Sequence, residues 1–282
     1  MKRAAIDRAL APALAFLALY LGALALVLAL VPPRGPAAAQ WSALSAAIFA
    51  TIAAPLLIER RLDAVGLGSG PRRALRDLIG GFGIACAVAG SGALLIAAAS
   101  GLEVVRGSGI RWMEVGAIMV PAALHEEVVF RGYAFQRLAR WSMAGAIAAG
   151  SVPFAALHLG NRAVGPIAVA NIALAGVLLG LAYFAFRSLW APIGIHFGWN
   201  FVSGPLLGHE VSGWRPGGSL LATIDPGPAW LTGGEFGIEG SILVLVPLAV
   251  AIAGLRLRVR NGPPERGVNT IGASASSERE PS

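Results

Sequence analysis

The sequence predicts an all-α fold, a polytopic transmembrane helical bundle, and three observations lead to this prediction. Hydrophobic residues make up 56% of the 282 residues and charged residues only 13%, whereas soluble domains typically carry about 25% charged residues. The mean hydropathy is +0.70. Apolar runs close to the roughly 20 residues that a helix needs to cross the hydrocarbon core recur along the chain. The composition therefore excludes a water-soluble globule.

Taken in order, the apolar runs predict about eight transmembrane helices. They lie at residues 10–31, 41–58, 77–100, 112–136, 142–159, 164–186, 189–207 and 239–256. Lys2, Arg3 and Arg8 precede the first run as in a signal peptide, but the run is longer than the roughly 7–15 residues of a signal sequence, so we expect a retained helix.

The segments between and after the helices have a different composition. Residues 203–238 are rich in Gly, Pro and Trp, which predicts a long irregular loop on the outer face. Residues 261–282 are polar and rich in Ser and Pro, which predicts a disordered cytoplasmic tail. We therefore expect residues 1–260 to form a single membrane-embedded domain.

The net charge of +7 comes almost entirely from arginines that flank the apolar runs. Most of these arginines lie in the loops on one side of the membrane, which is also the side of both ends of the predicted domain. The positive-inside rule identifies this side as the cytoplasm, so we expect both termini to be cytoplasmic. These positions indicate topology and not a nucleic-acid partner. The preference for Arg over Lys, with abundant Ala and Gly, is typical of a GC-rich bacterial genome, so we expect an integral protein of the bacterial inner membrane.

Four ionisable residues cluster within a short stretch of the fourth run, namely His125, Glu126, Glu127 and Arg131. A charged side chain at the bilayer centre costs about 2.5–3.5 kcal/mol on insertion scales, and such groups usually face a cavity or a partner. The cluster therefore marks a candidate functional site. His125 is adjacent to Glu126 in sequence and is expected to face away from such a site.

Three polar pairs share helical i, i+4 spacing, which places both members on one helix face. They are Glu127 with Arg131, Phe154 with His158, and His196 with Asn200. If Arg131 pairs with Glu127, Glu126 is left free to act as a general base. Each pair also has a purely structural interpretation, as an ion pair or a polar contact that joins helices, and the spacing alone leaves both interpretations open.

At these positions the chain resembles the CPBP family, the CAAX prenyl proteases and bacteriocin-processing or immunity proteins, also called the CAAX protease/Abi family. Glu126-Glu127-Val-Val-Phe-Arg131 is similar to its EExxxR motif. Phe154 to His158 fits FxxxH, and His196 to Asn200 fits HxxxN. The motifs occur in the family's order within residues 112–207, the motif core of the predicted domain.

The resemblance implies an intramembrane endopeptidase that cleaves a membrane-associated protein or peptide. It implies catalytic roles for Glu126, His158, His196 and Asn200, with Glu127 and Arg131 in support. Glu126, His158 and His196 also form a His₂Glu set of the kind that binds zinc. The family is described both with and without a metal, and the sequence leaves open whether one divalent metal or none is used.

Two further functions and three other protease types were weighed. A non-catalytic membrane adaptor or bacteriocin-immunity protein would have the same fold, and a proton-coupled transporter would require internal repeats that the sequence does not show. The zincin motif H-E-x-x-H, a Gly-x-Ser-Gly serine site and paired intramembrane aspartates are all absent from the sequence.

Overall fold

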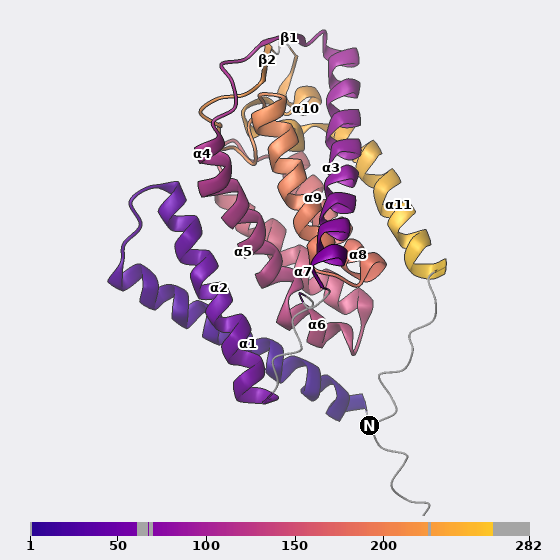
Figure 1. Ribbon diagram of the computed structural model, residues 1–282. Coiled ribbons are helices and arrows are strands. Elements are labelled where there is room, and N and C mark those ends of the chain that lie inside the picture. The colour runs from indigo at the N-terminus through magenta and orange to yellow at the C-terminus, as the bar shows by residue number, and fades with distance from the viewer. Residues whose placement is uncertain (1, 61–66, 68–69, 225–226, 262–282) are drawn as a thin grey trace, which may run out of the picture.

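The computed structural model describes residues 2–60, 67, 70–224 and 227–261, and it is almost entirely helical (Figure 1). The principal helices are α1 (Lys2–Leu30), α2 (Pro36–Ile58), α3 (Pro71–Ser100), α4 (Trp112–Glu114), α5 (Val120–Arg131), α6 (Tyr133–Ala139), α7 (Met143–Leu157), α8 (Pro166–Phe186), α9 (Trp190–Phe201), α10 (Ala229–Thr232) and α11 (Leu245–Asn261). The all-α bundle predicted from the sequence is confirmed.

Six of the eight predicted spans are long and apolar enough to cross a membrane by themselves, within the part of the chain that the structure describes. The other two are the segments that carry the polar motifs. One is a helical stretch from α4 through the π-helical turn Val115–Met119 to α5, and it contains Glu114 besides the EExxxR charges. The other is the short helix α9, which ends in the π-helical turn Val202–Leu206. Both segments therefore depend on neighbouring helices for burial, and π turns occur frequently at functional sites.

Proline and glycine set the ends of several long helices. The helices α2, α3 and α8 each begin at a proline that follows a glycine. Proline suits the first helical position, because its fixed φ matches the helix and its missing N–H would have no intrahelical acceptor there. Helix α3 ends at Gly101, whose φ of 69° lies in the left-handed region that glycine adopts without strain.

The loop predicted to be irregular is more ordered than its composition suggests. Strand β2 (Leu221–Ile224) pairs antiparallel with β1 (Glu103–Arg106), with Glu103 opposite Ile224 and Arg106 opposite Leu221. The same loop contains α10 and the 3₁₀ turn Gly234–Phe236, and the 3₁₀ turns Ile238–Gly240 and Ile242–Val244 follow and lead into α11. The small sheet and α10 lie at one end of the bundle, and the last turn of α11 lies at the other (Figure 1).

Helix α9 packs closely along α3, and glycines allow this approach (Figure 1). A Cβ atom on Gly194 would lie 2.2 Å from the carbonyl oxygen of Leu78, and one on Gly81 would lie 2.1 Å from that of Ala191. Small residues at helix crossings let backbones meet in membranes. This contact fixes the position of His196, which lies between Gly194 and Gly198 on α9.

Two large hydrophobic clusters form most of the core, and α5 lies between them. The larger joins α3, α7, α8, α9 and α11, and partly buried Phe130 packs against it. The smaller joins α1, α2, α5 and α9, and includes buried Val128. Many large apolar side chains on the outer faces of the long helices are exposed, such as Leu14 and Leu94, as expected where lipid is the solvent. Of the predicted disordered tail, residues 261–282, Asn261 is the last residue of α11, and the rest lies outside the described residues.

Candidate active site

Glu127 is the centre of a buried polar cluster between α5 and α9. Its Oε1 atom accepts from Arg131 Nη1 at 3.1 Å and from His196 Nδ1 at 2.8 Å. Neither Glu127 nor Arg131 has any exposed side-chain surface. The pairing of Glu127 with Arg131 expected from their spacing is therefore present, and His196 joins it from a second helix.

Arg131 also connects this cluster to α7 and α8. Its Nη2 atom donates to the carbonyl oxygen of Gly176 at 3.1 Å, and its guanidinium lies 4.7 Å from the centre of the Phe154 ring. A buried ion pair requires such additional contacts to offset the desolvation of its charges. Arg131 thus holds three helices around Glu127.

Glu126 has a different environment from Glu127, although the two are adjacent in sequence. Its side chain is 21% exposed, and its buried Oε2 atom has no hydrogen-bond partner among the described residues. His196 Nε2 lies 4.0 Å from this Oε2 atom. Since His196 uses Nδ1 to donate to Glu127, its Nε2 atom faces Glu126, and a water placed beside these two atoms can hydrogen-bond to both.

His158 lies beside the cluster but does not touch Glu126. Its Nδ1 atom donates to the carbonyl oxygen of Phe154 at 2.7 Å, and its ring centre lies 4.9 Å from that of Phe154. The Phe154 ring also meets His196 edge to face at 5.9 Å. Phe154 therefore contacts both imidazoles. Within the described residues no hydrogen bond or ion pair joins His158 to Glu126.

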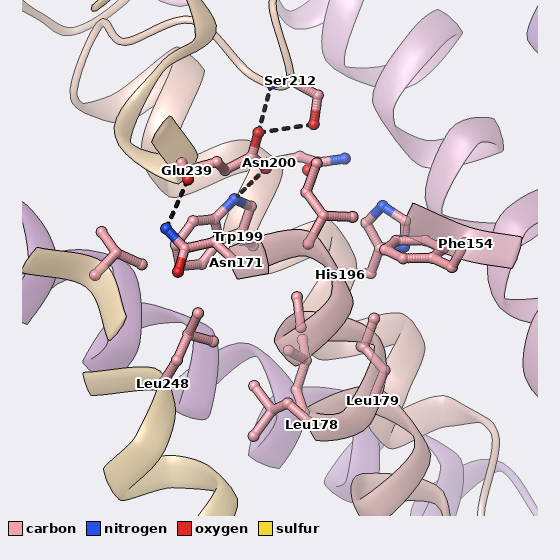
Figure 2. A pocket seen from close by; sticks show the side chains of 14 residues that line it. Phe154, Asn171, Leu178, Leu179, His196, Trp199, Asn200, Ser212, Glu239 and Leu248 are labelled. Carbon is pink, nitrogen blue, oxygen red and sulfur yellow. Dashed lines mark hydrogen bonds between the residues drawn. The ribbon is translucent and has the colours of Figure 1, made fainter. Parts of the chain in front are cut away.

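His196 and Asn200 lie on the same wall of a cavity, as their spacing predicted (Figure 2). His196 is 10% exposed and Asn200 is 9% exposed. Asn200 makes no hydrogen bond to Glu126. The structure thus brings Glu126, Glu127, Arg131 and His196 together, and it places His158 and Asn200 at the edges of that group.

The three candidate metal ligands do not fit a metal ion in this arrangement. Glu126 and His196 approach each other, but His158 is directed to the backbone of its own helix. No group of three His, Cys, Asp or Glu side chains in the described residues could hold a metal ion. The zinc set considered from the sequence is therefore not assembled, and no step below uses a metal.

A second buried carboxylate, Glu239, was missed by the sequence analysis (Figure 2). Its Oε1 atom accepts from Trp199 Nε1 at 2.7 Å, and its Oε2 atom accepts from both the backbone N–H and the hydroxyl of Ser212 at 2.7 Å. Asn171 Nδ2 donates to the carbonyl oxygens of Glu239 and Ser241, both at 2.8 Å. This network fixes the loop that follows α9 against α8 and α9. The available signal in the sequence was an acidic residue at the start of the last apolar run.

His125 points to α1. Its Nε2 atom hydrogen-bonds to the Tyr20 hydroxyl at 2.7 Å, and the two rings are 5.8 Å apart. This contact joins α5 to the first helix. It agrees with the expectation that His125 faces away from the site.

A comparison with protein-family models identifies one family. Residues 108–202 match the model described as Type II CAAX prenyl endopeptidase Rce1-like. No curated protein and no solved structure matches the chain. The matched residues include all three motifs, the whole of α5, and the α9 residues that meet it. The chain is therefore an integral membrane protein, and its residues 108–202 are similar to the CAAX prenyl endopeptidases of the CAAX protease (CPBP) family.

Proposed function

We propose that this protein is an intramembrane endopeptidase that hydrolyses a peptide bond of a membrane-associated protein or peptide with a water activated by Glu126. The observation that supports this most is the difference between the two adjacent carboxylates. Glu127 is held at Oε1 by Arg131 and His196, whereas Glu126 has no such partner among the described residues, and its buried Oε2 atom lies opposite His196. The match of residues 108–202 to that family supports a protease independently of this geometry.

In the proposed reaction the water lies between Glu126 and His196 Nε2. Glu126 takes one proton as the water oxygen bonds to the substrate's carbonyl carbon, and a tetrahedral intermediate forms. Glu126, with His158 as an alternative carrier, then delivers that proton to the amide nitrogen as the C–N bond breaks. General acid–base catalysis of this kind contributes roughly 10²–10⁴-fold to a rate.

The remaining residues position these groups. Asn200 is one helical turn from His196 on the same cavity wall, and its amide N–H is suited to donate to the oxyanion of the intermediate. Glu127 fixes the orientation of the His196 ring, and Arg131 offsets the buried charge of Glu127. His158 reaches the water only through a rotation or an intervening water, because Phe154 holds its Nδ1 atom.

The experiment is cleavage of a membrane-anchored peptide library in proteoliposomes, read by mass spectrometry. The wild type is expected to give defined products, and Glu126→Gln to reduce their rate by at least roughly 100-fold. Glu235→Gln is the matched control, because Glu235 is 64% exposed and pairs only with Arg162 at the surface. Undiminished cleavage by Glu126→Gln would refute the proposed mechanism. Full biological activity of that variant without any cleavage would favour the adaptor or immunity function.

A further inference from the structure

An apolar groove lies between α3 and α11, away from the carboxylates of the candidate active site. One wall is a single face of α11, from Val246 to Leu255. The other wall is a single face of α3, formed by Ile84, Ala87, Val88, Ser91 and Leu95. This α3–α11 groove encloses about 540 Å³, a volume within the range of about 300–1,000 Å³ that ligand sites usually have. It is therefore large enough to hold a long hydrocarbon chain.

The groove exists because the two helices spread apart where small residues face it. A Cβ atom on Gly92 would lie 3.1 Å from Val244 Cγ2, so α3 is close to the turn that precedes α11. From that end α11 diverges from α3 toward its last turn (Figure 1). Gly254 lines the groove near this last turn, and a Cβ atom on it would meet nothing within 4 Å. The space beside Gly254 is therefore open to a molecule from the membrane.

The lining matches the interior of a lipid leaflet. None of the described residues that line the groove is charged, and the Ser91 hydroxyl donates to the carbonyl oxygen of Ala87 in its own helix. Between Ile84 and Leu95 the groove follows α3 for about 16 Å of helical rise. Half of a hydrocarbon core that is about 30 Å thick has nearly this depth. Its length and chemistry therefore suit one acyl chain.

Arginines from both helices converge at the C-terminal end of α8, beyond one end of the groove. Arg258 on α11 donates from Nε to the carbonyl oxygen of Ala185 at 3.4 Å, and its guanidinium lies 4.4 Å from the centre of the Phe186 ring. Arg73 on α3 donates from Nη2 to the carbonyl oxygen of Phe186 at 3.0 Å. Contacts with α8 therefore hold the two guanidinium groups near each other.

This end of the groove carries an excess of positive charge. Arg258 follows the lining residue Gly254 by four positions, which places it one turn further on the same helix face. Asp77 accepts from Arg76 at 2.9 Å and lies 3.5 Å from Arg73 Nε, so one carboxylate faces two arginines. The side chains of Arg73 and Arg76 are 49% and 73% exposed, and Arg258 is exposed as well. These groups therefore favour an anion at the mouth of the groove.

We propose that the α3–α11 groove binds one acyl chain of an anionic phospholipid, and that Arg73, Arg76 and Arg258 bind its headgroup. Guanidinium groups suit this task, because their paired N–H donors match the oxygens of a phosphate. Basic pockets between transmembrane helices recognise anionic lipids in this way. A transmembrane helix from a second copy of the chain is the competing occupant, but it would have no use for the cations at the mouth. The proposal does not depend on the peptidase function.

The test compares two lipids that have the same chains and differ in headgroup charge. The full-length protein in detergent is incubated with equal amounts of dioleoylphosphatidylglycerol, which is anionic, and dioleoylphosphatidylcholine, which has no net charge. Native mass spectrometry with release of the bound lipid then identifies what is retained. One phosphatidylglycerol is expected to be retained, with a preference of roughly tenfold or more. Glycerol 3-phosphate, which carries the charge without the chains, is expected not to displace it.

Two matched pairs of variants locate the site. Gly254→Phe fills the groove and is expected to abolish lipid retention, whereas Gly90→Phe is expected to preserve it. Gly90 lies outside the lining, and a Cβ atom on it also meets nothing within 4 Å. Arg258→Gln is expected to reduce the preference for phosphatidylglycerol by roughly fivefold. Arg260→Gln removes the same charge from an exposed residue of the same helix and is expected to leave the preference unchanged.

Each contrary result removes a stated part of the proposal. Equal retention of the two lipids, or retention of neither, overturns it. Retention by Gly254→Phe at the wild-type level shows that the lipid binds elsewhere. Equal losses in Arg258→Gln and Arg260→Gln show a general attraction to a basic surface, and displacement by glycerol 3-phosphate shows an anion site without the groove. A dimer that retains no lipid assigns the groove to a second copy. Peptide cleavage enters none of these measurements, so they stand apart from the proposed function.

Discussion

Two buried carboxylates hold helix α9, Glu127 at His196 and Glu239 at Trp199, and their oxygens are occupied differently. Glu127 concentrates its contacts on Oε1, which accepts from His196 and Arg131, while its Oε2 atom has no partner. Glu239 uses both oxygens. The first carboxylate is incompletely satisfied and the second is fully satisfied.

The source of the compensating charge also differs. Glu127 faces a guanidinium that has no exposed surface, whereas Glu239 is held by the neutral donors of Trp199 and Ser212. Glu127 is adjacent to a second carboxylate, Glu126, whose buried Oε2 atom has no hydrogen-bond partner among the described residues. In the proposed mechanism proton transfer belongs to the Glu127 region, whereas the hydrogen bonds of Glu239 hold the loop that follows α9 against that helix.

Removal of the buried cation is expected to have the largest effect on stability. Arg131→Met leaves the charge of Glu127 buried and unpaired, a change that costs about 3–5 kcal/mol when one partner of a buried pair is lost. The loss of stability is measured by thermal unfolding of the purified protein in detergent. The double variant Arg131→Met/Glu127→Gln is expected to recover part of the loss. An unchanged unfolding temperature for Arg131→Met alone would remove the distinction between the two regions.

A smaller loss is expected at Glu239, because no opposite charge is left unpaired there. Glu239→Ala removes the acceptor of the Trp199 N–H and of the N–H and hydroxyl of Ser212. Each such hydrogen bond contributes about 0.5–1.5 kcal/mol net, so the loss is expected to be about 1.5–4.5 kcal/mol. The same unfolding assay applies. Glu235→Ala is the control, since Glu235 is an exposed acid of the same loop. If the two variants unfold at the same temperature, the Glu239 network does not position the loop.

The hydrogen bond between Tyr20 and His125 provides a test outside both regions. Tyr20→Phe removes one hydroxyl, and a typical intramolecular hydrogen bond contributes about 0.5–1.5 kcal/mol. We expect a modest decrease in unfolding temperature with peptide cleavage retained. A selective loss of cleavage with normal stability would show that α1 takes part in the reaction.

The smallest effect is expected at the surface. Arg162 and Glu235 form an ion pair 2.9 Å long, but both side chains are about two-thirds exposed, and exposed pairs contribute about 0–1 kcal/mol. The free energy of unfolding of Arg162→Gln is therefore expected to lie within about 1 kcal/mol of that of the wild type in the same detergent assay. A loss comparable to that of Glu239→Ala would show that the exposed ends of the outer loop are as important as its buried anchor.

The sequence predicted the Glu127 region because its contacts follow local periodicity. The spacing of Glu127 and Arg131, and of His196 and Asn200, places each pair on one helix face. Polar residues are rare within apolar runs, so both pairs were candidates for a functional site. The bundle was predictable for the same reason, from runs of apolar residues. The contact between Glu127 and His196 could not be predicted in detail, since it depends on how α5 meets α9.

The Glu239 region has no comparable local pattern. Asn171, Trp199, Ser212 and Glu239 come from two helices and a loop, at irregular separations in the chain. Composition indicated an irregular loop for residues 203–238, because Gly and Pro are frequent there. Tertiary hydrogen bonds, together with the pairing of β2 with β1, order that loop instead.

The most direct test of the account is the turnover number and unfolding temperature of Glu126→Gln beside those of Glu239→Gln. The account predicts that Glu126→Gln unfolds like the wild type but loses roughly 10²–10⁴-fold in turnover. Glu239→Gln is predicted to unfold at a lower temperature while its folded fraction still cleaves peptide. Wild-type turnover by Glu126→Gln, with its unfolding temperature unchanged, would contradict the assignment of Glu126 as the residue that activates water.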